Sequence, residues 1–351
     1  MRSLARLAAF VALSTFAAAQ AELVFTLNQS QSNFNWSGTS NLGPIVGNPS
    51  TAFQTAGTTN MRIYPLAADA IDSADFPGNG DAAVVPDLHG KINNPFPFLP
   101  PLATIDITNL HLKASAPQFP VAANGAFSAS LTMTAISGTM TVTPLGSAPS
   151  VSDLAGMSST PQAQSGTLTQ VGTTLNLVMP VNTTFPFSDP ASGASGSITI
   201  IGTLRGSWTC PAPATYCTAK VNSLGCTPAI SASGTASWAG AAPFTIGATN
   251  VLNQKTGLLF YGYAPSASPF QGGWKCVASP TLRSVPQSSG GSASGNDCTG
   301  VFGFDFKAII DAHTDPLLLP GEEVFAQVWS RDPASASTTN LTNAVRFTVA
   351  P

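Results

Sequence analysis

The sequence predicts an all-β protein with two domains: an N-terminal antiparallel barrel or large sandwich, followed by a disulfide-stapled β-sandwich. Three observations predict this fold. Many short segments alternate apolar and polar residues, which is the period of half-buried strands. Gly (31) and Pro (29) are plentiful and separate these segments. Charged residues are only 8% of the chain, whereas exposed helix faces are usually rich in Glu and Lys.

The first 21 residues have the parts of a secretory signal peptide. Arg2 and Arg6 form the positive start, residues 7–19 the apolar run, and residues 19–21 a small-x-small cleavage site. The apolar run is shorter than a membrane-spanning helix requires. We therefore expect a secreted protein, extracellular or at the cell surface, without a transmembrane segment after cleavage.

Residues 22–209 are predicted to form the N-terminal domain. Its expected strands are 23–27, 33–37, 58–65, 103–113, 126–143, 166–171, 174–178 and 196–208. The short gap between 171 and 174 predicts a hairpin. Pairing of the first strands with the last would close a barrel and remove both free edges. The proline-rich stretch 94–101 is predicted to be a loop, because proline lacks the ladder donor.

Residues 210–216 are predicted to be a linker, since two prolines and small residues favour a short, extended spacer. The second domain, 217–351, is again β. Its expected strands are 244–248, 257–263, 301–306, 324–329 and 344–349. A short helix is expected only within 305–313.

Five cysteines lie in the last 142 residues, and in an exported protein they are first interpreted as disulfides. Cys217, Cys226, Cys276 and Cys298 are the predicted partners. Three pairings are open, and we favour Cys217–Cys226 with Cys276–Cys298, because both close local loops. Cys210 is left over and its fate is open. Zinc is disfavoured, because no C-x-x-C pair or finger-spaced histidine occurs.

Several segments of the second half resemble a known family. They are YCTAKVNSLGC (216–226), GLLFYG (257–262), PFQGG (269–273), NDC (296–298), FDF (304–306) and VFAQVWSRDP (324–333). Together they look like an uncharacterised C-terminal β-domain of secreted bacterial proteins, over about residues 215–349. This resemblance implies export and a shared module, but no activity.

Two looser resemblances concern the folds of the domains. Residues 319–325 are similar to the turn that feeds a core strand in fibronectin type III sandwiches, although Val or Phe replaces the corner tyrosine. This similarity implies an immunoglobulin-like or fibronectin-like sandwich. Residues 26–36 look only loosely like the opening strands of lipocalin-like barrels.

Catalytic signatures are absent from the sequence. There is no Gly-x-Ser-x-Gly elbow and no His-Glu-x-x-His helix. A Ser–His–Asp triad built on His89, His111 or His313, and a glycosidase with two aspartates as acid and base, remain alternatives. The formal net charge of −3 and the lack of basic clusters argue against nucleic acid or anionic lipid as a partner.

The candidate metal ligands are aspartates, and calcium is the only cofactor that they indicate. The set is Asp69, Asp72, Asp75 and Asp81, which continues to Asp87. The alternative is a solvated loop, or a short helix over 66–75 whose aspartates face solvent. A similar set at 311–315 is interpreted as a turn, because Asp315 precedes a proline.

The candidate binding residues are aromatic. Tyr261 and Tyr263 share one face of a predicted strand, Phe260 faces the other way, and Trp274 follows two glycines. Flat rings stack on sugars, so they indicate a platform for carbohydrate or a cell-surface polymer. The alternative is that the tyrosines cover the second sheet. We expect a non-enzymatic binding, adhesion or surface protein; the alternatives are a secreted polysaccharide hydrolase and a carrier of an apolar ligand. The oligomeric state is open.

Overall fold

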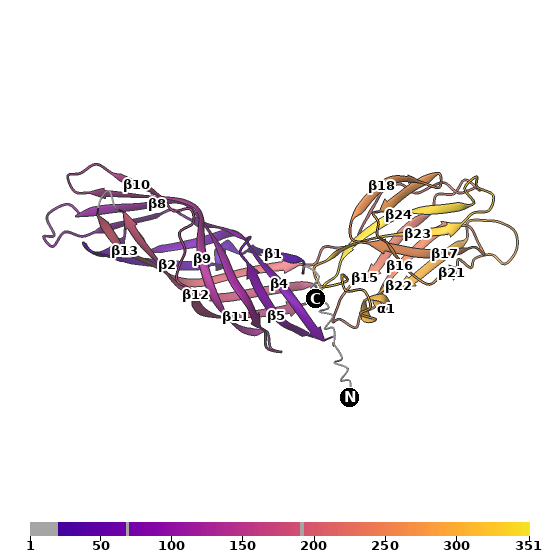
Figure 1. Ribbon diagram of the computed structural model, residues 1–351, viewed down its shortest axis with the longest axis horizontal. Helices are drawn as coiled ribbons and strands as arrows, with labels where there is room; N and C mark the ends of the chain where they lie inside the picture. Colours follow the sequence, from indigo (N-terminus) through magenta and orange to yellow (C-terminus); the bar gives the residue numbers. More distant parts are fainter. Residues whose placement is uncertain (1–19, 68–69, 190–192) are drawn as a thin grey trace, which may run out of the picture.

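The computed structural model describes residues 20–67, 70–189 and 193–351, and it is nearly all β. The strands fall into two groups that lie end to end in an elongated molecule (Figure 1). The predicted signal segment, apart from Gln20 and Ala21, lies outside the described residues. Within the described ranges, no helix has the length and apolar character needed to cross a membrane.

The first group is the N-terminal domain, a sheet of 13 strands. Its elements are β1 (Glu22–Leu27), η1 (Gln29–Gln31), β2 (Asn33–Ser40), β3 (Gly43–Gly47), β4 (Ala52–Ala67), β5 (Ala70–Pro77), β6 (Asp81–Val85), β7 (Leu88–Ile92), β8 (Ala103–Pro120), β9 (Ala126–Pro144), β10 (Ser150–Asp153), β11 (Gln162–Val171), β12 (Thr174–Asp189) and β13 (Ala194–Thr209). The helix considered over 66–75 is wrong: the described residues of this stretch belong to β4 and β5, and residues 62–67 pair antiparallel with residues 70–75.

Near the second domain, the sheet closes on itself. The strands pair in the order β1–β4–β5–β8–β9–β11–β12–β13 and return to β1 through the pairs Thr26–Ser207 and Leu27–Gly206. Pairing of first and last strands, as predicted, leaves this end without free edges. The predicted hairpin is confirmed, with Val171 opposite Thr174 and Gly172 at a φ of 59°.

The other half of the domain has a different strand order. There the sheet runs β12–β13–β2–β3–β7–β8–β9–β10. The β2–β3, β7–β8 and β9–β10 hairpin connections end at the pole that lies farthest from the second domain (Figure 1). We call this pole the distal end.

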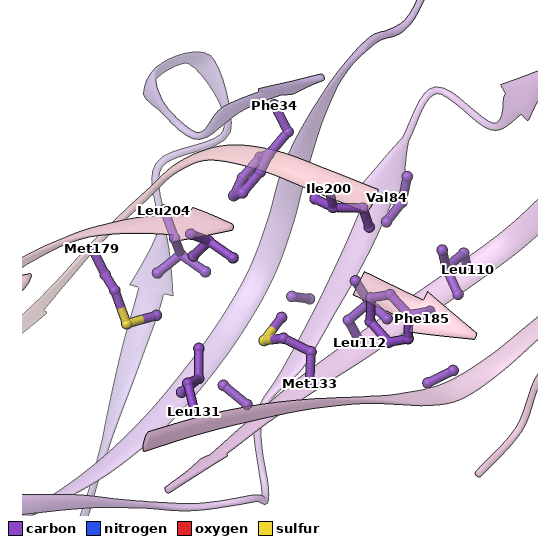
Figure 2. Close-up of a cluster of buried hydrophobic side chains, with 14 of the residues drawn as sticks. Phe34, Val84, Leu110, Leu112, Leu131, Met133, Met179, Phe185, Ile200 and Leu204 are labelled. Atoms are coloured by element: carbon purple, nitrogen blue, oxygen red, sulfur yellow. The ribbon is translucent and has the colours of Figure 1, made fainter. Parts of the chain in front are cut away.

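The interior of the N-terminal domain is filled with side chains. Figure 2 shows Phe34, Leu112, Met133, Phe185 and Leu204 projecting from different strands into the same space. An apolar cavity of about 30 Å³ remains beside Phe185, enough for about one water-sized sphere. An apolar ligand of lipid size therefore has no room in this conformation.

The second group of strands is the C-terminal domain. Its elements are β14 (Ala214–Tyr216), β15 (Ala229–Gly234), β16 (Phe244–Val251), β17 (Thr256–Gly262), β18 (Pro265–Phe270), β19 (Gly273–Val277), β20 (Leu282–Arg283), β21 (Gln287–Ser288), β22 (Gly300–Asp305), α1 (Phe306–Asp311), β23 (Glu323–Arg331) and β24 (Thr339–Thr348). A sheet ordered β14–β24–β23–β17–β20 packs on a sheet ordered β15–β16–β22. The helix expected within 305–313 is confirmed as α1, and Asp305 caps it by accepting from Ala308 N at 3.0 Å.

The domains meet through few polar contacts. Gln20 Nε2 donates to Pro320 O, and Gln170 Nε2 donates to Pro351 O. The predicted linker is only partly a spacer, because its last three residues form β14 and pair with β24. Cys210 is a buried free thiol, and burial raises its pKa to about 11, which favours the protonated form.

The four predicted cysteines are bonded, but the favoured pairing is wrong. The bonds are Cys217–Cys276 and Cys226–Cys298. Asn222 Oδ1 accepts from the backbone of Leu224 and Cys226, so the segment after Cys217 closes as a turn of its own. Tyr216 donates its hydroxyl to Cys276 O at 2.6 Å and so places Cys217 beside β19. Contacts formed in the folded domain therefore decide which cysteines pair, although bonds that close short loops would cost less chain entropy.

Candidate functional site

A groove with three aromatic residues in its lining lies on the outer face of the C-terminal domain. Its volume is about 310 Å³, which is at the small end of the range for ligand sites. The β18–β19 hairpin forms one side, β20 the other, and β17 with β23 form the floor. Its lining residues are Leu258, Phe260, Phe270, Gln271, Lys275, Thr281, Arg283 and Trp329. We call it the hairpin groove.

The floor exists because β17 and β23 are apolar on both faces. Leu259 and Val328 point into the main core between the two sheets. Their neighbours Leu258, Phe260 and Trp329 point outward, since successive strand residues face opposite sides. The hairpin covers part of this outer face, and a second, small core forms beneath it. Trp329 stays half-buried at the boundary, with its ring available to the groove.

The wall carrying Phe270 is held rigidly. The hairpin turns at Gln271 (φ 49°) and Gly272 (φ 74°), and both residues therefore have left-handed backbones. Trp329 Nε1 donates to Gln271 Oε1 at 2.9 Å, and Lys220 Nζ donates to Gln271 O at 2.9 Å. Phe270, which is 39% exposed, is thus presented at a fixed position.

A buried glutamine anchors the same hairpin from beneath. Gln327 on β23 is fully buried (0% exposed) and accepts from Cys276 N at 3.0 Å. Its amide donates to Trp274 O at 2.9 Å and to Thr342 O at 2.7 Å. The Cys217–Cys276 bond ties the hairpin a second time. The groove is therefore preformed and does not depend on a mobile loop.

The charge of the groove is positive. Lys275 and Arg283 line it, and none of the eight lining residues is acidic. Arg331 stacks on the Trp329 ring, with its guanidinium carbon 5.4 Å from the ring centroid. Aromatic faces beside ammonium and guanidinium donors suit a ring-shaped ligand that carries negative charge.

The predicted sugar platform is not assembled as expected. Tyr261 is 3% exposed and packs in the main core against Phe306, with ring centroids 5.1 Å apart. The hydroxyls of Tyr261 and Tyr263 both donate to buried Asp315, and burial together with this carboxylate raises their pKa values. Trp274 is 42% exposed. Its neighbour Lys275 lines the groove, and successive strand residues face opposite sides, so the Trp274 side chain points away from the groove. The tyrosine face is the core face, while Phe260 on the opposite face lines the groove.

The predicted calcium ligands also have other partners. Asp69 lies outside the described residues, and Asp72 is exposed. Asp75 is buried and accepts a bidentate pair from Arg62, at 2.9 and 2.7 Å, and a hydroxyl from Tyr64. Asp81 instead contacts His111. Among the residues with described positions, no three His, Cys, Asp or Glu side chains gather as a metal site.

The histidines were the alternative candidates. His89 Nδ1 lies 2.7 Å from Asp106, and His111 Nδ1 lies 2.6 Å from Asp81, both on the outer surface of the N-terminal domain. Ser137 faces His111 across β8 and β9, but its hydroxyl donates to Asn109 O. A Ser–His hydrogen bond is therefore not formed there. In the 311–315 segment, Asp315 accepts from Leu317 N and makes the predicted turn.

Sequence reasoning missed the residues that line the hairpin groove. Trp329 and Phe270 stand in segments already recognised as strand and motif, but nothing local marks them as neighbours. The available signal was the apolar character of both faces of 257–263 and 324–329, which indicates a sheet covered on both sides. Comparison of the chain with known protein families, curated proteins and solved structures finds no match.

Proposed function

We propose that this is a secreted, non-enzymatic binding protein, and that the hairpin groove binds an acidic carbohydrate of a cell-surface polymer. The observation that carries the proposal is the lining itself. Three aromatic side chains, Phe260, Phe270 and Trp329, stand beside two cations in a preformed groove. Two disulfides and the signal-like start support action outside the cell.

Binding without turnover is favoured by the absence of any acidic residue from this lining, because glycosidases place two carboxylates around the scissile bond. The preference for an anionic sugar follows from Lys275 and Arg283. A uronate carboxylate accepts the paired donors of a guanidinium, while a neighbouring ring stacks on an aromatic face.

Isothermal titration of the full chain with oligosaccharides of uronic acids, and with their neutral counterparts, tests the proposal. Phe270→Ala and Arg283→Gln change exposed groove residues, so the fold should be retained. Each is expected to weaken binding about tenfold or more, and Arg283→Gln should also lower the dependence on salt. Trp274→Ala is the matched control, an exposed aromatic on the same hairpin that points away from the groove.

Two results would contradict the proposal. Equal loss of affinity in Trp274→Ala and Phe270→Ala would place the site elsewhere on the hairpin. Release of new reducing ends from the oligosaccharides, abolished by an Asp-to-Asn variant, would instead support the hydrolase alternative.

A further inference from the structure

The distal end of the N-terminal domain carries exposed apolar side chains on three neighbouring hairpin loops. They are Phe98 (82% exposed), Phe96 (59%), Leu145 (51%), Leu42 (46%) and Leu99 (45%). We call these five residues the distal tip. Isolated exposed apolar residues are ordinary, but a cluster of them at one pole requires an explanation.

The three loops are neighbours because the strands beneath them are paired. Leu145 N donates to Leu102 O, and Leu102 N donates to Ile92 O, which joins loops 145–149 and 93–102. Ile45, three residues after Leu42, pairs with Ile92 and brings loop 41–42 alongside. The pole formed in this way is the end of the long axis opposite the C-terminal domain (Figure 1).

The side chains of the distal tip are not part of the hydrophobic core of the domain. Directly below the loops, Ile45, Ile92 and Ala103 are 2%, 1% and 1% exposed, so the core is complete without the tip residues. The Phe96 and Phe98 rings contact each other, with centroids 6.0 Å apart, but remain open to solvent. Burying them would stabilise the protein only in contact with another apolar phase.

The loop that carries both phenylalanines is preorganised. Four of the nine residues 93–101 are proline, which fixes backbone angles. Phe96 N donates to Asn94 Oδ1 at 3.1 Å, and Leu99 N donates to Phe96 O at 3.0 Å, so the segment is a defined turn. The rings are therefore held outward before any partner arrives, which reduces the entropy cost of insertion.

The lack of charge in the three loops indicates what kind of partner the distal tip contacts. Loops 41–42, 93–102 and 145–149 contain no charged residue, and the charged residue of their flanking strands that is nearest in sequence is Lys91. No ionic group in these loops would have to be desolvated on entering the headgroup–acyl boundary of a bilayer. Because no basic residue is present either, attraction to anionic headgroups is not the driving force.

We propose that the distal tip inserts into the interfacial region of a lipid surface, driven by apolar burial and not by charge. Phenylalanine and leucine are the side chains that interfacial segments bury at this boundary. Three loops that end at one pole reach a planar surface together, with the long axis directed away from it. The inference is independent of the hairpin groove, which lies in the other domain.

Flotation of the full chain with vesicles of zwitterionic phosphatidylcholine tests the proposal. Phe96→Ser/Phe98→Ser should lower the partition coefficient at least about tenfold, since each buried phenylalanine contributes strongly. Val171→Ser is the matched control: Val171 is 69% exposed on the β11–β12 hairpin, away from the distal end, and its replacement should leave binding unchanged. Raising the salt concentration should not release the protein.

A spectroscopic readout gives independent support. Phe98→Trp should bring a blue shift of fluorescence on addition of the same vesicles. Native protein that fails to float with phosphatidylcholine would overturn the proposal. So would concentration-dependent dimerisation that Phe96→Ser/Phe98→Ser abolishes while no vesicle binding is seen, because the tip would then be a protein interface.

Discussion

Removal of the Cys226–Cys298 bond tests the pairing and its energetic role together. The bond spans 72 residues, and closing a loop of that length in the unfolded chain lowers its entropy by the equivalent of about 4 kcal/mol at 25 °C. The Cys217–Cys276 bond encloses part of the same segment, so the unfolded chain is already constrained when it remains intact. We therefore expect Cys226→Ala/Cys298→Ala to lose somewhat less, about 3 kcal/mol.

The assay is urea unfolding of the full chain, followed by hydrogen exchange of amides in β17 and β23. These strands lie in the core of the C-terminal domain and report its free energy separately from the N-terminal domain. Amides of β12 and β13 serve as the internal control and should be unchanged. A loss below about 1 kcal/mol, or a non-reducing peptide map that joins Cys217 to Cys226, would refute the reasoning.

Three further predictions concern buried polar groups. Gln327→Leu leaves Cys276 N, Trp274 O and Thr342 O without this partner, and urea unfolding should show a loss of about 2–4 kcal/mol. Arg62→Met leaves buried Asp75 with only a tyrosine hydroxyl and should cost about 2 kcal/mol, whereas adding Asp75→Asn should recover most of it; no recovery would contradict an uncompensated charge. Burial raises the pKa of Glu322, so the folded protein holds this proton more tightly and loses stability as pH rises from the ordinary glutamate range through the raised pKa. Glu322→Gln should therefore raise the melting temperature at pH 7 and reduce its dependence on pH between 4 and 7, and an unchanged pH profile would count against this.

Local sequence patterns predicted the structure correctly where it depends on residues that are close together in the chain. Val171–Thr174 formed the expected hairpin, because a two-residue gap with Gly172 allows the tight turn. Phe306–Asp311 became the expected helix, because Asp305 supplies its cap. Pairing of the first and last strands of the N-terminal domain followed from the need to remove free edges.

The same sequence patterns did not predict which residues line the candidate site. Alternation correctly separated Tyr261 from Phe260, but it does not state which face meets the opposite sheet. Both faces are apolar, so the sequence allows either a sugar platform or a core face for the tyrosines, and the structure packs them in the core. The glycine-rich context of Trp274 points to that residue, whereas the groove is lined by Trp329, 55 residues later in the chain.

The sequence by itself determined the all-β class and the location of most turns, because strand period and turn chemistry are properties of short segments. It also indicated the four cysteines that form bonds. Tertiary structure decided which cysteines pair, which strand faces are covered, and that Leu42, Phe98 and Leu145 share one pole. These features depend on the order of strands in a sheet. That order is set by packing between residues distant in sequence, which local patterns do not encode.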